Sequence, residues 1–113
     1  MRFPSPALVI SESDFQVSVV ALAAWQGWRV YHTHDSRHSP SGYPDLTLVR
    51  EERLIFAELK REDEDATPEQ QEWLDDLEAT GQAETYLWKP SSWDSLMVTL
   101  ARPQHTKRSN IRG

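Results

Sequence analysis

Two carboxylates and one lysine are spaced so that they could hold a divalent cation and cleave a phosphodiester. Pro44-Asp45 is followed, after twelve residues, by Glu58-Leu59-Lys60. Carboxylate oxygens are the hard ligands that Mg²⁺ and Mn²⁺ prefer. A bound cation offsets the charge that develops on phosphorus and makes hydroxide available from water near neutral pH. The lysine would lie on the same strand face as the second acid, where its charge can orient the attacking water or stabilise the transition state.

A β-hairpin is expected to bring these side chains together. Residues 45–50 and 53–60 form two apolar runs that are separated by two glutamates, a pattern typical of a hairpin with a tight polar turn. Both faces of the second run are apolar until its last residues, which predicts a strand in the middle of a covered sheet. Glu58 and Lys60 then emerge on one face at the end of this strand. The hairpin register brings Asp45 near Glu58.

Helix and strand signals alternate along the rest of the chain. Apolar residues at helical spacing predict a helix over residues 11–26, and aromatic and β-branched residues predict a strand over residues 28–33. A capping box of Thr67 and Gln70 begins another helix. The remaining expected elements are a loop over 34–43, a strand over 84–88 and a helix that begins at Ser91 or Ser92. The order helix, three strands, helix, strand, helix predicts an α/β sandwich around a mixed sheet of about four strands.

Composition restricts the classes of protein that this chain can represent. The 113 residues include 12 Lys and Arg, 18 Asp and Glu and no Cys, so the formal charge is −6. This length fits one domain, and the lack of Cys excludes thiolate metal sites and disulfides. An acidic chain is unlike a protein that coats nucleic acid, but it can still carry a local basic site. The longest apolar run, over residues 17–25, is too short to span a membrane, and we expect a cytoplasmic protein.

The ordered set of motifs resembles the virus-type replication-repair nuclease (VRR-NUC) domain of the PD-(D/E)XK nuclease superfamily. The resemblance runs from about Ser11 to Leu100. The matching segments are Gly42-Tyr43-Pro44-Asp45-Leu46, Leu54 to Lys60, Thr67-Pro68-Glu69-Gln70 with Trp73-Leu74, Leu77 to Gly81, Tyr86 to Pro90, and an opening helix that carries Glu12 and Gln16 and ends in Gly27-Trp28. The resemblance implies a restriction-endonuclease-like fold over residues 11–101, with an N-terminal extension over 1–10 and a basic tail over 102–113.

The resemblance also implies roles for individual residues. Asp45, Glu58 and the backbone carbonyl of Leu59 would bind Mg²⁺ or Mn²⁺, and Lys60 would be the catalytic lysine. Glu12 would complete the site from the first helix, and Gln70 would reach in from the second. The expected contacts with DNA come from Gln16, Arg37 and Arg61, and further candidates for phosphate contacts are Arg29, Arg50, Arg53 and Lys89. The implied protein is a homodimeric endonuclease of a bacterial cell or phage-infected host that hydrolyses branched, Holliday-junction-like DNA by metal-activated water.

Several of these residues also have structural interpretations. Asp45 at a strand start can accept backbone amides, and Glu58 can form an ion pair with Lys60 on one strand face. A helix dipole favours Glu12 in a first turn. A capping box alone would explain Gln70, and a capping box of Ser13 and Gln16 would explain Gln16.

Two segments leave further alternatives open. His32 and His34 alternate onto one strand face and, with Asp35 and nearby His38, could form a second metal site, although such residues are also common at a polar strand end. The acidic run over residues 62–65 departs from the family pattern. If this run faces the cleft, it repels DNA and changes the choice of substrate; if it faces solvent, it only tunes affinity.

Two other functions are compatible with the same sequence. The chain could be a nuclease-like module that recognises DNA ends or junctions, or a subunit that is inactive without a partner. It could also be an acidic mimic of DNA, which would bind neither metal nor DNA. The complete set of Asp45, Glu58 and Lys60 favours the enzyme, because a module that only binds has no need for all three.

Overall fold

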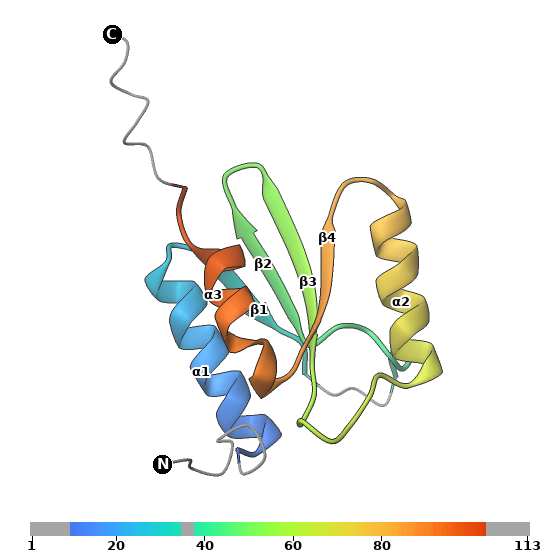
Figure 1. Ribbon diagram of the computed structural model, residues 1–113. Coiled ribbons are helices and arrows are strands. Elements are labelled where there is room, and N and C mark those ends of the chain that lie inside the picture. Colours follow the sequence, from blue (N-terminus) through green and yellow to red (C-terminus); the bar gives the residue numbers. More distant parts are fainter. Residues whose placement is uncertain (1–9, 35–37, 104–113) are drawn as a thin grey trace, which may run out of the picture.

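Two helices cover one face of a four-stranded sheet and a third helix packs on the other face (Figure 1). The computed structural model describes residues 10–34 and 38–103. The elements are, in chain order, α1 (Glu12–Trp25), β1 (Arg29–His32), β2 (Leu46–Arg50), β3 (Arg53–Leu59), α2 (Pro68–Ala79), β4 (Glu84–Trp88), the short 3₁₀ helix η2 (Pro90–Ser92) and α3 (Trp93–Leu100). The predicted α/β class and element order are confirmed, with η2 as an addition. The predicted N-terminal extension and basic tail lie almost wholly outside the described residues.

The sheet has the order β1-β2-β3-β4, in which only the pair β3 and β4 is parallel. β2 and β3 form the predicted hairpin, with Thr47 opposite Phe56 and Leu46 opposite Ala57. Continuing this register by one residue puts Asp45 opposite Glu58. α2 provides the crossover from β3 to β4 and packs on these two strands. The metal-ligand candidates therefore lie where the hairpin meets the end of the central strand β3.

The main core lies between the sheet and the pair α1 and α3. Phe15 and Val19 of α1 and Leu96 and Leu100 of α3 are fully buried in it. Their partners on the sheet are Leu46, Leu48, Ile55, Ala57, Leu59 and Trp88. Burying this much apolar surface fixes the sheet against α1 and so fixes the first turn of α1 beside the hairpin.

Arg50 of the hairpin is buried in this core, whereas Arg53 is partly exposed and pairs with Glu84. The guanidinium of Arg50 donates to the carbonyl oxygens of Gln26 (3.0 Å) and Leu100 (2.8 Å), and it lies over the Trp28 ring. The guanidinium of Arg53 donates to Glu84 through two bonds of 2.7 Å. The expectation that Arg50 contacts phosphate is wrong, because its side chain is buried and satisfies helix-end carbonyls.

Side-chain caps define the starts of the two long helices. Ser11 caps α1, since its Oγ accepts from the amide of Asp14 at 3.1 Å. Gln16 therefore takes no part in a capping box at this end. Thr67 and Gln70 form the predicted capping box of α2. No helix within the described parts of the chain is both long enough and apolar enough to cross a membrane.

Candidate active site

The end of the hairpin brings Asp45, Glu58 and Lys60 together. Asp45 immediately precedes β2, and its Oδ2 accepts a hydrogen bond of 2.8 Å from the amide of Leu59. Glu58 lies in β3 with 2 % of its surface exposed. Lys60 follows β3 directly and is half-buried. Its backbone amide donates a hydrogen bond of 3.0 Å to the carbonyl oxygen of Trp88 in the parallel strand β4. The strand pairing on both sides of β3 thus holds the backbone that carries all three functional groups.

The environment of Glu58 strongly disfavours its ionised form. Burial raises the pKa of Glu58 from 4.5 to about 8, and the negative charge of Asp45 and a hydrogen bond with that carboxyl act in the same direction. The positive charge of Lys60 acts in the opposite direction. Within the described chain, the Oε1 atom of Glu58 is buried and has no hydrogen-bond partner. A buried carboxylate oxygen without a partner is costly unless something cationic is bound to it.

Glu12 brings a third carboxyl to the same region from the first turn of α1. Burial is the main cause that raises its pKa, and the charge of Asp45 adds to this effect. The charges of Lys60 and Arg61 oppose the shift, whereas Glu64 reinforces it. Glu12 therefore lies close enough to Asp45 and Lys60 for their charges to act on its carboxyl.

The donor set suits a hard divalent cation. Asp45 and Glu58 are opposed carboxyls, and Glu58 has an oxygen that lacks a partner among the described residues. Mg²⁺ is commonly held by one or two carboxylates and completes its shell with water and phosphate. No group of three or more His, Cys, Asp or Glu among residues 10–34 and 38–103 is arranged to hold a metal ion. A cation here would be bound by the carboxylates of Asp45 and Glu58 and by further oxygen atoms. Metal binding by the Leu59 carbonyl stays a prediction.

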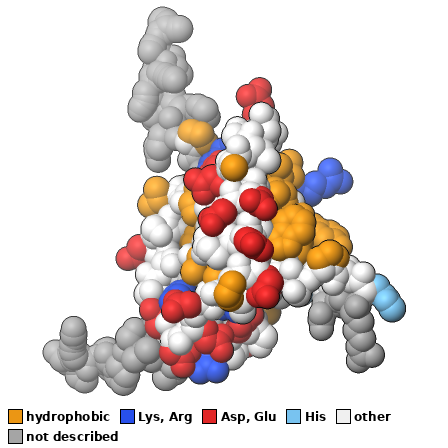
Figure 2. Space-filling view, turned by 90° about the vertical axis from the view of Figure 1, so that its right-hand side faces the viewer, with side chains coloured by type: hydrophobic (Ala, Val, Ile, Leu, Met, Phe, Trp, Pro, Cys, Tyr) orange, Lys and Arg blue, Asp and Glu red, His pale blue; other side chains and the backbone are white. Residues whose placement is uncertain are grey.

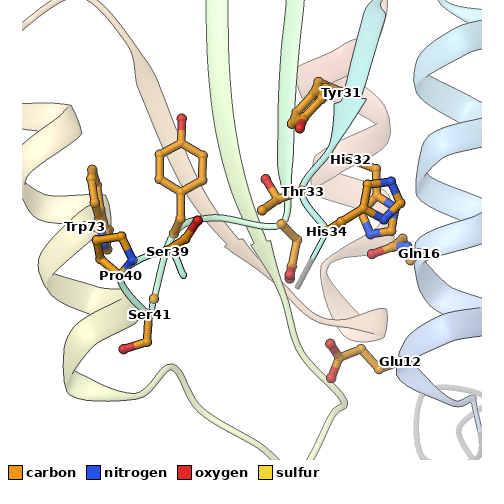
Figure 3. Close-up of a pocket in the computed structure, with 13 residues that line it drawn as sticks. Glu12, Gln16, Tyr31, His32, Thr33, His34, Ser39, Pro40, Ser41 and Trp73 are labelled. Carbon is orange, nitrogen blue, oxygen red and sulfur yellow. The ribbon is translucent and has the colours of Figure 1, made fainter. Parts of the chain in front are cut away.

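A cavity of about 900 Å³ opens beside this site. Its lining residues come from α1, the end of β1, the loop that leads to β2, and α2 (Figure 3). They are Glu12, Gln16, Tyr31, His32, Thr33, His34, Ser39, Pro40, Ser41, Gly42, Tyr43, Asp45 and Trp73. Glu12, Gln16 and the rings of His32 and His34 gather beside α1, whereas Trp73 and Pro40 lie across the cavity beside α2 (Figure 3). Asp45 therefore belongs both to the candidate metal site and to the cavity, and Glu12 lines the same cavity.

The other predicted site residues differ in whether they line the cavity or contact other parts of the chain. Gln16 lines the cavity. The side chain of Gln70 accepts from the Thr67 amide at 2.8 Å, so its carbonyl oxygen serves the capping box, and a catalytic part for Gln70 stays a prediction. Arg61 forms an exposed ion pair with Asp63 at 3.1 Å. Arg37 lies outside the described residues, and its expected contact with DNA is untested.

The histidine pair shows no second metal centre in the described part of the chain. The rings of His32 and His34 lie 5.0 Å apart and are tilted by 46°. Asp35, which the sequence also suggests as a ligand, lies outside the described residues, and no metal-holding cluster includes either histidine within them. Both rings line the cavity, where they can contact a bound molecule.

Most acidic side chains of residues 62–65 form hydrogen bonds or ion pairs with other residues of the chain. The carboxylate of Glu62 accepts from the Ser91 amide at 2.9 Å, and Asp65 pairs with Lys89 at 2.9 Å. Asp63 pairs with Arg61. These contacts tie the loop after β3 to the connection between β4 and α3. The charge of Glu64 acts on Glu12 and so reaches the site.

The aromatic side chains of the cavity are functional candidates that the sequence did not single out. Tyr43 makes edge contacts with Trp73 (5.0 Å between ring centroids) and with Phe56 (6.1 Å). Tyr31 is 61 % exposed although it lies in a strand. The alternation of apolar residues over 28–33 contains Tyr31, but it does not reveal that this part of the sheet faces solvent.

Comparisons with known proteins agree on the kind of domain. A family model of the VRR-NUC domain matches residues 5–87. A solved structure described as a VRR_NUC domain protein superposes with a TM-score of 0.59 over 81 % of this chain and 91 % of that chain, at 20 % identity. At that identity the likeness concerns the fold. No curated protein matches the sequence.

Proposed function

The chain belongs to the VRR-NUC domain family, whose members are nucleases of the PD-(D/E)XK type, and from this premise we propose that it is a divalent-metal-dependent endonuclease that hydrolyses phosphodiester bonds of DNA. The observation that carries the proposal is the buried Glu58 carboxyl. It faces Asp45, has an oxygen without a partner in the described chain, and lies two residues before Lys60. A purely structural glutamate would lower its free energy by pairing both oxygens.

Each side chain has a distinct part in the proposed mechanism. Asp45 and Glu58, with the Leu59 carbonyl, would hold Mg²⁺ or Mn²⁺, which supplies positive charge against the phosphate and acidifies a water molecule. Lys60 is a compact cation beside these acids that can orient the attacking water or stabilise charge on the phosphate. Glu12 would place a further carboxylate beside Asp45 and Lys60 from the first turn of α1. Hydrolysis forms one bond between phosphorus and the water oxygen and breaks the bond to the leaving sugar oxygen, without a covalent enzyme intermediate.

The proposed substrate is branched DNA, and the proposed state is a homodimer, because two sites related by two-fold symmetry suit paired nicks in a junction. The outer face of α1 supports a self-association surface. After the polar first turn, in which Ser13 and Asp14 are exposed, the exposed residues of α1 are apolar: Val17 (67 % exposed), Ala21, Ala24 and Trp25 (84 % exposed). Apolar residues that gather on one outer helix face are typical of interaction sites. The substitution Trp25→Glu should shift the mass measured by light scattering from dimer to monomer.

Cleavage of labelled DNA tests the enzymatic proposal. Glu58→Gln keeps the size of the side chain and removes its charge, so we expect nearly complete loss of cleavage in Mg²⁺ or Mn²⁺. Glu52→Gln is the matched control, since it makes the same substitution in the exposed turn of the same hairpin, at the other end of β3. Equal activity in both variants would remove Glu58 from the site.

A recognition module is the second candidate. The formal charge of −6 and the acidic side chains that follow the exposed face of α2 (Figure 2) repel DNA phosphate, so such a module would hold DNA at a local basic site or through a partner protein. This candidate predicts that the wild-type protein binds four-way junctions but leaves them uncut in both metals. A protein that binds neither Mn²⁺ nor DNA would instead be an acidic mimic.

A further inference from the structure

The cavity next to Asp45 has a lining unlike that of a phosphate-binding groove. Its charged described residues, Glu12 and Asp45, are both acidic, and no Lys or Arg is among the described residues that line it. Two carboxylates would repel a phosphate group that entered the cavity without a cation. The sugar-phosphate backbone is therefore expected at the metal-site edge of the cavity, and a neutral chemical group is expected inside it.

The remaining lining residues suit a flat, hydrogen-bonding ring. Tyr31, Tyr43 and Trp73 supply aromatic surface, and the hydroxyl and imidazole groups come from Thr33, Ser39, Ser41, His32 and His34. A nucleobase combines an aromatic face with polar edges and stacks on such side chains. The volume of about 900 Å³ lies within the range of pockets that bind small ligands.

Tyr31 is the most informative member of this set. Its ring is 61 % exposed on the edge strand β1, whereas α2 packs on β3 and β4. Hydrophobic side chains gather on the surface beside α2 (Figure 2). This ring contributes little to the core and lines the cavity, so its face is available to stack on a bound ring. Tyr43, in contrast, is held against Trp73 and Phe56 and forms a rigid wall.

We propose that this cavity receives an unpaired nucleobase adjacent to the scissile phosphate. The inference rests on the proposed endonuclease function and narrows its substrate to DNA that has at least one unpaired nucleotide beside the cleavage point. A base within a regular duplex is stacked and paired on both strands, so its aromatic face is not available to Tyr31. An unpaired base enters at much lower free-energy cost, and this difference selects the substrate.

Binding measurements test this inference without cleavage. Three labelled duplexes are compared by fluorescence anisotropy with Ca²⁺ as the cation: one fully paired, one with a single extra adenine, and one with an abasic residue in place of that adenine. Gels confirm that the DNA stays intact. The wild-type protein should bind the adenine bulge more tightly than both other duplexes, because the abasic bulge reproduces the bend but offers no base.

Substitutions then assign the preference to the cavity. Tyr31→Ala should weaken binding of the adenine bulge by about 5- to 150-fold, the range that stacking of one base on an aromatic side chain covers, and leave the paired duplex unchanged. Tyr31→Phe should keep the preference because it keeps the ring. Val98→Ala is the control, since it truncates another exposed apolar side chain, on α3, that does not line the cavity. Thermal melting confirms that each variant folds.

The outcomes separate this inference from the proposed function. Equal affinity of the wild-type protein for the adenine and abasic bulges would overturn the proposed base pocket. The same conclusion would follow if Tyr31→Ala lowered the affinity for all three duplexes equally. Cleavage in Mg²⁺ by the same wild-type protein would then leave the endonuclease proposal standing. A base preference that depends on Tyr31, found in a protein that cuts no DNA, would support the pocket and contradict the enzyme.

Discussion

Replacing Glu58 by Gln should stabilise the metal-free protein at neutral pH. The pKa of Glu58 is raised from 4.5 to about 8, chiefly by burial and then by the charge of Asp45. Because the folded state favours the neutral carboxyl, the contribution of Glu58 to stability is fully present below pH 4.5 and is lost as the pH rises towards 8. Gln is neutral at every pH and has nearly the same shape, so it should escape this loss.

The expected size of the effect follows from the shift in pKa. Between pH 4.5 and pH 7 the unfolded carboxyl ionises while the folded one keeps its proton. Each pH unit in that interval costs about 1.4 kcal/mol, so the wild-type protein should lose up to about 3 kcal/mol relative to Glu58→Gln at pH 7. This is a large part of the free energy of unfolding of a small domain.

Urea denaturation in EDTA at several pH values provides the assay, with fluorescence of the five tryptophans as the signal. The difference between Glu58→Gln and wild type should be near zero at pH 4 and should grow up to pH 8. Glu52→Gln, in the exposed hairpin turn, should show no such growth. Mn²⁺ should stabilise wild type more than Glu58→Gln, because it binds the folded site. A pH-independent difference, or a Gln variant less stable at every pH, would refute the reasoning.

Three further substitutions test how the fold supports the site. Glu84→Gln should lower stability at neutral pH but not in acid, because the Arg53 guanidinium lowers the pKa of Glu84 and its stabilising charge is lost as the pH falls below 4.5; urea midpoints at pH 7 and pH 3 measure this. Thr67→Ala should cost about 1 kcal/mol in urea denaturation by removing the capping box of α2. Gly42→Ala should lower both stability and DNA cleavage, since Gly42 has a φ of +97° and an added Cβ would lie 2.8 Å from the backbone of Glu69. An unchanged midpoint in any of these variants contradicts the corresponding contact.

Local patterns account for most of the fold. The polar pair between two apolar runs indicates the hairpin, and the alternation that puts Asp45, Thr47 and Val49 on one face agrees with the burial of Leu46 and Leu48 on the other face. The Thr67 and Gln70 capping box is visible because it is built from residues three apart. Such features depend on neighbouring residues, and the sequence displays them directly.

Long-range packing accounts for what the sequence did not predict. Arg50 is charged, so the sequence suggests a surface contact, but it is buried against carbonyls at the ends of α1 and α3 that are distant in the chain. The exposure of Tyr31 depends on where α2 packs across the sheet, which periodicity along β1 does not encode. The site itself is intermediate. Asp45 and Glu58 are recognisable from spacing. The Glu58 oxygen that lacks a partner among residues 10–34 and 38–103 follows instead from burial that many residues create together.

Metal-dependent cleavage of a labelled four-way junction, beside a linear duplex of the same sequence, tests the central claim most directly. The wild-type protein should cut the junction in Mg²⁺ or Mn²⁺ and not in EDTA, and Lys60→Ala should abolish the cuts while the protein stays folded and still binds the junction. An uncut junction in both metals, or a Lys60→Ala variant as active as wild type, would contradict the account of the site.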